Sequence, residues 1–206
     1  MTDIDLVQAC ADSYTLPDHY WMHSWSADDI NVKHRVINGC DIVSFRGTAD
    51  VVDWFTDFKA WPADDPVLGM CHAGFLEGMD RVFSEVLPVL GQVIYVTGHS
   101  LGAARALIFA ALCRKAGRPP AALVGFGTPR VGGSKLASIL EGTPMRLYRN
   151  GLDPVTEVPL GLLYQHPVKP TQIGNADMAH DPIKDHFIAS YCAALRDYEN
   201  QRRIAA

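Results

Sequence analysis

Hydrophobic positions along the chain fall into short apolar runs and into longer stretches of helical period. Short apolar runs between turn residues are typical of strands, and apolar positions every three or four residues are typical of helices. We expect strands at 32–37, 41–45, 93–97, 122–126 and 145–149. We expect helices at 4–14, 50–59, 75–87, 103–115, 133–140 and 183–198. Strands that alternate with helices predict an α/β fold with a mainly parallel central sheet flanked by helices.

Two of these strand regions have additional features. The turn pair Asn38-Gly39 separates the first two strands, which favours a β-hairpin. The almost wholly apolar run 93–97 suits a strand that is buried on both faces. Lys33, His34 and Arg35 form a short basic step, which we interpret as a solvated strand edge rather than a nucleic-acid patch.

The composition is that of an ordinary globular protein. The 206 residues are 48% hydrophobic and 20% charged, so we expect one domain spanning residues 1–206. The formal net charge is −5, and no long run of Lys and Arg suggests a nucleic-acid partner.

The cysteines and the N-terminal sequence indicate in which cellular compartment the protein is expected. The five cysteines contain no C-x-x-C pair and indicate neither a disulfide framework nor a thiolate zinc site. Asp3 and Asp5 lie where a signal peptide would be apolar. The longest uncharged run, 86–104, contains proline and several glycines, which makes it a poor membrane span. We therefore expect a cytoplasmic protein.

The pentapeptide Gly98-His99-Ser100-Leu101-Gly102 is the strongest candidate for chemistry. It has the form G-x-S-x-G and lies between a predicted strand and a predicted helix, as a nucleophile elbow requires. Ser100 would then present its hydroxyl at the positive end of the helix, where the Leu101 amide can face an oxyanion. A phosphate-binding loop is the alternative, but its lysine and its spacing are absent.

A serine nucleophile needs a base and an acid, which follow it along the chain in α/β-hydrolases. Asp153 is the best candidate for the acid, because it follows the strand 145–149 and precedes Pro154. The other acidic candidates are Glu141, Glu157, Asp177, Asp181 and Asp185. The histidines available as the base are His166, His180 and His186.

Several ordered blocks resemble the fungal-type lipase family, also called lipase class 3. The blocks are Phe45-Arg46-Gly47-Thr48, Asp53-Trp54, His72-Ala73-Gly74-Phe75, the run 98–104, Gly127-Thr128-Pro129-Arg130-Val131-Gly132, the run 150–155, and Asp185-His186 with Tyr191. Together they span about residues 40–195. GHSLG by itself is shared by many hydrolases, but the ordered set is specific to this family.

The resemblance implies an α/β-hydrolase fold and a serine carboxylic ester hydrolase. It assigns catalysis to Ser100, Asp153 and His186 through an acyl-enzyme, with Thr48 beside Leu101 as the second oxyanion donor. It implies an ester or lipid substrate, transient contact with a lipid surface, and neither a cofactor nor a metal ion. A hydrolase of small soluble esters, thioesters or amides remains an alternative, as does a non-catalytic binding protein with the same fold.

The remaining motif residues have less direct roles. Trp54, Phe55 and Phe58, with Trp61, form an aromatic set within 50–61. They fit an amphipathic helix packed on the core, or a lid that contacts substrate or lipid. We expect His72 to be hydrogen-bonded near the site, His99 to pack behind the elbow, and Arg130 to brace the loop after its strand.

Overall fold

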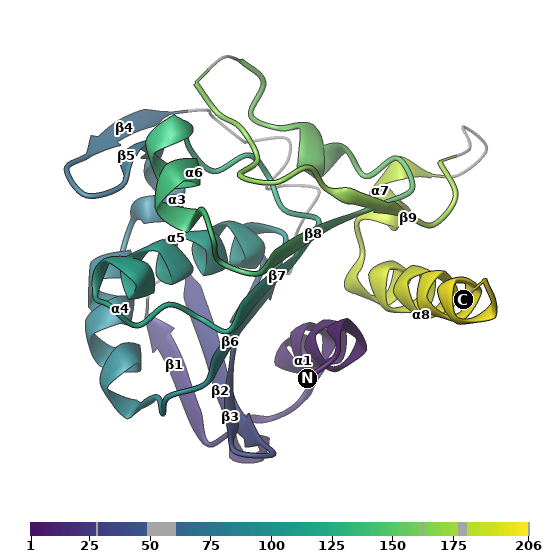
Figure 1. The fold of residues 1–206 in the computed structure, drawn as a ribbon, viewed down its shortest axis with the longest axis horizontal. Coiled ribbons are helices and arrows are strands. Elements are labelled where there is room, and N and C mark those ends of the chain that lie inside the picture. The colour runs from purple at the N-terminus through teal and green to yellow at the C-terminus, as the bar shows by residue number, and fades with distance from the viewer. Residues whose placement is uncertain (28, 49–60, 162, 177–180, 206) are drawn as a thin grey trace.

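The computed structural model describes residues 1–27, 29–48, 61–161, 163–176 and 181–205. A seven-stranded sheet forms its centre, with helices on both faces (Figure 1). In spatial order the strands are β1 (His23–Ala27), β2 (Ile30–Ile37), β3 (Cys40–Arg46), β6 (Ile94–His99), β7 (Ala122–Phe126), β8 (Met145–Asn150) and β9 (Thr171–Ile173). The pairs β1–β2 and β2–β3 are antiparallel, and the pairs from β3 to β9 are parallel. The predicted α/β fold is confirmed.

Side chains that alternate along the strands form two separate cores. Ile42 and Val124 face one side of the sheet, whereas their neighbours Val43 and Leu123 face the other. The first side is covered by α1 (Asp3–Thr15) and α8 (Ile188–Ile204). The other side is covered by α3 (Ala73–Leu76), α4 (Met79–Val86), α5 (Leu101–Lys115) and α6 (Ser134–Leu140). Burial on both faces explains why these strands are so apolar.

Short elements complete the described structure. They are a two-stranded hairpin of β4 (Pro62–Asp65) and β5 (Gly69–His72), the helix α7 (Pro182–Asp185), and the 3-10 turns η1 (Asp18–Tyr20), η2 (Leu87–Val89) and η3 (Pro154–Glu157). The hairpin predicted at Asn38-Gly39 is confirmed: both residues have positive φ, 51° and 75°, as a two-residue hairpin turn requires.

Two predicted helices are each two helices in the structure. The stretch 75–87 is divided between α3 and α4 at Gly78, which has a left-handed φ of 74° that glycine adopts at low cost. The stretch 183–198 is divided between α7 and α8 at His186 and Phe187, and Phe187 has extended backbone angles. In both places the helical spacing of apolar residues continues along the sequence, although the helix itself is interrupted.

The short or polar strands are not predicted by the sequence pattern. β1 has the sequence HSWSA and β9 has only three residues, so neither shows an apolar run. Because β1 pairs with β2, the interpretation of Lys33, His34 and Arg35 as a solvated edge is wrong. His34 is fully buried, and its Nε2 donates to Asp41 over 2.8 Å. The predicted helix 50–59 lies outside the described residues.

Close backbone contact fixes the turn between β6 and α5. A Cβ on Gly102 would lie 2.1 Å from the carbonyl oxygen of Phe45 in β3, and one on Gly98 would lie 2.4 Å from the carbonyl oxygen of Gly102. Both neighbours are backbone atoms, so no side-chain rotation can relieve the contact. The two glycines therefore let the helix start directly against the sheet.

A buried chain of hydrogen bonds joins α1 to this turn. The Tyr14 hydroxyl accepts the Gly47 N–H (3.0 Å) and lies 2.9 Å from Nδ1 of His99. The other ring nitrogen of His99, Nε2, donates to the carbonyl oxygen of His186 over 2.7 Å. Because Nε2 donates, Nδ1 of a neutral His99 accepts from Tyr14. Burial and the nearby His186 lower the pKa of His99 to about 3, so the ring stays neutral.

Gly102→Ala is expected to destabilise the protein by about 3 kcal/mol, because overpacking against rigid backbone has few ways to relax. Gly117→Ala, at the other end of α5, is the matched control. Gly117 has a φ of 72° and nothing within 4 Å of a built Cβ, so only the left-handed backbone costs free energy, about 1 kcal/mol. Urea unfolding of both variants measures the difference, and equal losses would contradict the clash.

Folding stability is expected to fall as the pH is lowered from about 6.5 towards 3. In this window His99 takes up a proton in the unfolded chain but not in the folded protein, where its pKa is about 3. The loss attributable to His99 is roughly 1.4 kcal/mol per pH unit. Urea unfolding at several pH values should give a shallower pH dependence for His99→Asn than for the unsubstituted protein. Identical pH dependences would show that His99 takes up its proton equally in both states.

Candidate active site

Ser100 occupies the sharp turn between β6 and α5. Its backbone angles, φ 59° and ψ −130°, are unusual for a residue with a side chain. Its N–H donates to the carbonyl oxygen of Phe126, at the end of the neighbouring strand β7, over 3.0 Å. The Ser100 hydroxyl is buried and has no hydrogen-bond partner within the described part of the chain. A strained serine with an uncommitted hydroxyl is the geometry expected of a nucleophile elbow.

Asp153 lies in the turn after β8 and accepts three hydrogen bonds. Its Oδ1 accepts the Val155 N–H (2.9 Å), and its Oδ2 accepts from the Tyr191 hydroxyl (2.6 Å) and from Nδ1 of His186 (2.8 Å). Burial by itself would raise the pKa of Asp153, but the bonds and charge of His186, with the bonds from Tyr191 and Val155, outweigh it and lower the pKa. The carboxylate therefore stays ionised and can orient the imidazole.

His186 connects the acid to the nucleophile side of the site. Because its Nδ1 donates to Asp153, Nε2 carries the lone pair of the neutral ring. That Nε2 atom is buried and unpartnered among the residues that the structure describes. A Cβ on Gly127 would lie 2.9 Å from both Asp153 Oδ2 and His186 Cε1. Since Gly127 follows Phe126, which binds the Ser100 amide, serine, histidine and aspartate meet at the ends of β6, β7 and β8.

Gly47, the neighbour of the predicted donor Thr48, and the predicted donor Leu101 both lie next to Ser100. A Cβ on Gly47, the neighbour of Thr48, would lie 3.0 Å from Ser100 Cβ and 2.5 Å from the carbonyl oxygen of His99. Leu101 is the first residue of α5, where backbone N–H groups have no partner inside the helix. The structure thus brings the loop before Thr48 and the start of α5 to the same side of the elbow.

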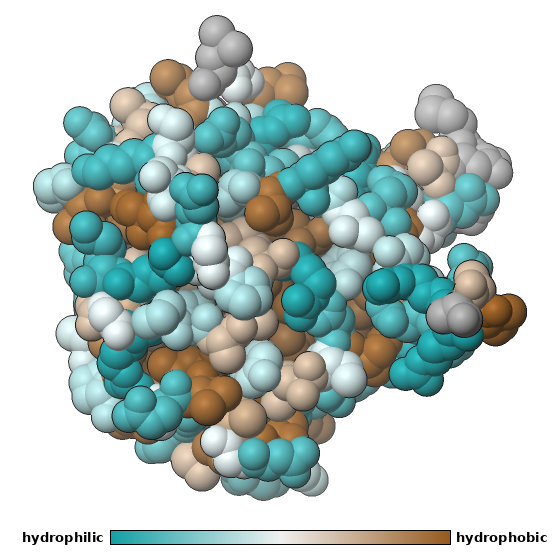
Figure 2. Space-filling view, in the orientation of Figure 1, coloured by the Kyte–Doolittle hydropathy of each residue, from teal (hydrophilic) through white to brown (hydrophobic). Residues whose placement is uncertain are grey.

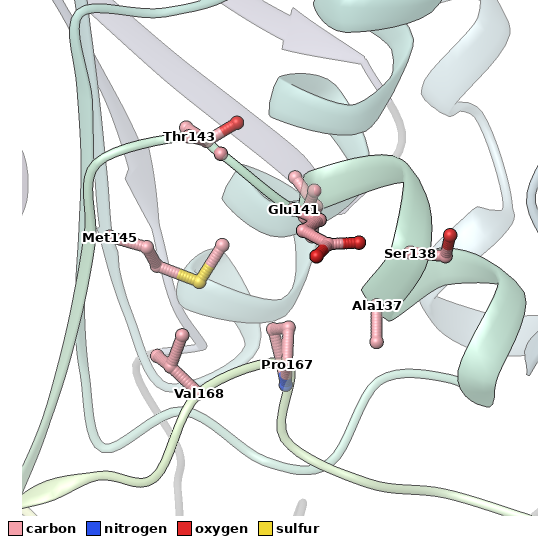
Figure 3. Close-up of a pocket in the computed structure, with 9 residues that line it drawn as sticks. Ala137, Ser138, Glu141, Thr143, Met145, Pro167 and Val168 are labelled. Atoms are coloured by element: carbon pink, nitrogen blue, oxygen red, sulfur yellow. The ribbon is translucent and has the colours of Figure 1, made fainter.

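Most of the other candidates for the catalytic acid have contacts elsewhere in the structure. Glu157 pairs with Arg130 and Arg149, and Asp181 caps α7. Asp185 accepts the Leu152 N–H over 2.8 Å. Glu141 lines a pocket at the end of α6 (Figure 3), and Ser100, Asp153 and His186 are not among the residues that line it.

The remaining alternatives are histidines or fall outside the described residues. Nε2 of His166 donates to the carbonyl oxygen of Thr156 over 2.8 Å. Asp177 and His180 lie outside the described residues, as do Trp54, Phe55 and Phe58.

The structure gives contacts for His99, His72 and Arg130, and the hydrogen bond of His72 near the site stays a prediction. His99 packs behind the elbow, with its ring centroid 4.8 Å from that of His186. His72 stacks on Phe75 at 4.2 Å. Arg130 donates to the carbonyl oxygens of Glu157 and Pro159, so it ties the loop after β7, in which it lies, to the segment after Asp153.

Three contributors to the site had no predicted role. Tyr191 binds Asp153, Tyr14 binds His99 and Gly47, and Gly127 leaves the space in which the Asp153–His186 pair lies. Tyr191 and Gly127 lie in the family-like blocks, so the signal was present. Tyr14 is 85 residues from its partner His99, and its helical pattern gave no indication of a polar contact.

The described residues provide neither a cluster of metal ligands nor a membrane-spanning helix. Within the described ranges, no group of three or more His, Cys, Asp or Glu residues could hold a metal ion. Among the same residues, no helix is long and apolar enough to cross a membrane. The pocket of Figure 3 lies between α6, the start of β8 and Pro167–Val168, and it is lined by both polar and apolar residues.

Comparisons with known proteins show which proteins this chain resembles. The chain is 34% identical over 130 residues to the secreted mono- and diacylglycerol lipase 1 of Fusarium solani, covering 57% of this chain and 39% of that protein. It is 31% identical over 176 residues to the secreted mono- and diacylglycerol lipase A of Penicillium cyclopium, covering 77% of this chain and 56% of the relative. The chain therefore spans between about two fifths and three fifths of the length of these relatives.

A solved structure and a family model extend the comparison. The crystal structure of a lipase from Rhizopus microsporus var. chinensis superposes with a TM-score of 0.73 at 24% identity, over 87% of this chain and 75% of that one. This likeness confirms the fold. The model of the family "Lipase (class 3)" matches residues 42–162, which is more than half of the chain. The chain therefore belongs to the class 3 lipase family.

Proposed function

We propose that this protein is a serine carboxylic ester hydrolase in which Ser100 is the nucleophile, His186 the general base and Asp153 the orienting acid. One observation carries the proposal. The Asp153–His186 hydrogen bond of 2.8 Å leaves His186 Nε2 as a lone-pair nitrogen. This nitrogen and the Ser100 hydroxyl are both buried and unpartnered among the described residues. Such an arrangement is suited to receiving a proton from the serine when substrate arrives.

The proposed reaction has two halves. Ser100 Oγ attacks the ester carbonyl carbon while its proton moves to His186 Nε2. The same proton then goes to the leaving alcohol as the ester C–O bond breaks, leaving an acyl group on Ser100. Water attacks this acyl-enzyme, gives its proton to His186, and releases the carboxylic acid as the proton returns to Ser100. Asp153 stabilises the imidazolium in both halves.

The oxyanion of each tetrahedral intermediate needs hydrogen-bond donors. We assign this role to the backbone N–H groups of Thr48 and Leu101. The support is positional: the loop at Gly47 packs against Ser100, and Leu101 starts α5. Donors held in place before the reaction contribute strongly, because no reorganisation is needed when charge develops.

Exposed apolar side chains on the segments that follow Asp153 and flank His186 in sequence favour a lipid-like ester as substrate. Leu160 and Leu163, on the segment that follows the acid loop, are 77% and 50% exposed. Ile183 and Phe187, on either side of His186, are 44% and 45% exposed. On the face drawn in Figure 2, brown hydrophobic residues lie at the upper edge of the molecule. Large exposed apolar side chains are typical of surfaces that meet lipid or acyl chains, and the relatives above are named as mono- and diacylglycerol lipases.

Ser100→Ala and His186→Ala are each expected to lower kcat/KM for a nitrophenyl ester by at least about four orders of magnitude, because triad members act as a unit. Both variants should remain folded by circular dichroism. Ser138→Ala and His166→Ala are the matched controls, since these side chains lie outside the triad, and they should retain near-normal activity. A severe loss in His166→Ala with an active His186→Ala would overturn the assignment of the base.

Activity on a short-chain triacylglycerol is expected to rise smoothly across the solubility limit of the substrate. The β4–β5 hairpin starts at Pro62, so only residues 49–61 separate the oxyanion loop from it. A stretch this short favours a site that accepts monomeric esters of short to medium chain length. Rate measured against substrate concentration tests this. A jump of about tenfold or more, equivalent to 1.4 kcal/mol in the barrier, would instead indicate interfacial activation by a lid.

A further inference from the structure

We propose that Asp185 is a positioning residue for the reaction. It holds the loop of Asp153 and the loop of His186 in a fixed position relative to each other. The inference rests on the proposed function of the triad. It concerns a carboxylate that the reaction itself does not use. Asp185 lies directly before His186 and accepts the N–H of Leu152, which lies directly before Asp153.

The two loops need such a connection because the chain between them is long. Asp153 and His186 are 33 residues apart in sequence. His186 follows α7, a helix of only four residues, which by itself is too short to hold a side chain rigidly. Catalysis depends on the position of His186 relative to Asp153 and Ser100, and a displacement of about 1 Å costs up to a hundredfold in rate.

Two hydrogen bonds connect the loops on either side of the catalytic pair. Asp185 Oδ2 accepts the Leu152 N–H over 2.8 Å, and the backbone carbonyl oxygen of Asp185 accepts from the Asn150 side-chain amide over 2.9 Å. The first bond joins the residues immediately before Asp153 and His186, and the second starts at Asn150, three residues before Asp153. They therefore fix the backbone from which both catalytic side chains start.

Gly151 provides the space for this contact. It has a φ of 51°, and a Cβ built on it would lie 2.2 Å from Asp185 Oδ2 and 2.5 Å from Asp185 Cγ. No side chain fits here while Asp185 keeps its position. The glycine and the carboxylate thus form one close contact, and neither can change without affecting the other.

The contact has the features of positioning rather than of simple stabilisation. Asp185 is only 9% exposed, and it forms no ion pair with the residues that the structure describes. Burying a carboxylate that has no ion pair costs free energy. The hydrogen bond to Leu152 offsets part of this cost, so Asp185 contributes little net stability to the fold. The N-terminus of α7 is capped by a different residue, Asp181, whose carboxylate accepts the Ile183 N–H over 3.0 Å.

The first test compares Asp185→Ala with Asp181→Ala. We expect Asp185→Ala to lower kcat by about tenfold to a hundredfold while KM stays within about threefold, because the transition-state geometry is affected more than binding. Asp185→Asn should restore most of the rate, since its amide oxygen can still accept the Leu152 N–H. Asp181→Ala should lower the melting temperature and leave kcat near normal. If Asp181→Ala lowers kcat as much as Asp185→Ala does, the positioning role is wrong.

The second test is a double-mutant cycle between positions 151 and 185. Gly151→Ala introduces a Cβ that meets the Asp185 carboxylate. In the Asp185→Ala background the atoms that it would meet are absent, and only the backbone strain of a positive φ remains. We therefore expect Gly151→Ala to reduce kcat far more in the unsubstituted protein than in the Asp185→Ala variant. Additive effects would show that the two residues do not act through one contact.

A third measurement separates this inference from the proposed function. The Nδ1 proton of His186, which is held by Asp153, can be followed by proton NMR without any substrate. We expect its resonance to shift or broaden in Asp185→Ala and to remain in Asp181→Ala. An unchanged resonance in Asp185→Ala overturns the positioning role, whether or not the protein hydrolyses esters. A protein without esterase activity whose resonance nevertheless responds to Asp185→Ala would fail only the proposed function.

Discussion

The contact between the start of α5 and the backbone of β3 is the constraint on which the site depends. Gly102 lies so close to the carbonyl oxygen of Phe45 that no side chain fits between them. This approach sets the position of the helix on the sheet and forces the reversal at Ser100. It also brings the loop that follows β3 beside the first residue of α5. The nucleophile and both proposed oxyanion donors thus have their positions determined by one backbone crossing.

Buried polar groups extend this arrangement to the rest of the site. His99 is neutral because it is buried, and a neutral ring has one donor and one acceptor nitrogen. It uses them to join Tyr14 of α1 to the backbone of His186. Burying such groups is costly unless each finds a partner. The network therefore favours one arrangement of α1, the oxyanion loop and the histidine loop over alternatives that would leave a polar atom unsatisfied.

Sequence patterns predicted those parts of the structure that depend on local chemistry. The apolar run at 93–97 and the glycines of the elbow identified β6, α5 and Ser100, because burial and tight turning restrict residue type directly. Asp153 was identified because acids of this kind follow a strand of the sheet. The base was selected only by the resemblance, since His166 and His186 look alike as single residues. Their difference lies in partners that fold next to them: Asp153 beside His186, and the carbonyl oxygen of Thr156 beside His166.

Features that depend on distant contacts were not visible in the sequence. The strand β1 is short and polar and exists because β2 offers it a hydrogen-bonding edge. The hydroxyl of Tyr14 and the carboxylate of Asp185 act on groups that are remote in sequence, and nothing in their neighbours marks them as polar contacts. The break in the helix at Gly78 needs a left-handed backbone, which a single glycine in a helical pattern permits but does not demand.

The catalytic residues are held by buried contacts, whereas the exposed apolar residues lie on connecting segments. The two parts can therefore determine different properties of the protein. Ser100, Asp153 and His186 are held by core packing and buried hydrogen bonds, which tolerate little change. The exposed apolar residues Leu160, Leu163 and Phe187 lie on connecting segments whose substitution leaves that core intact. Acyl-chain preference depends on the shape of the surface that receives the chain. In the function that we propose, the reaction type therefore depends on the sheet and its glycines, and the choice among esters depends on the connecting segments.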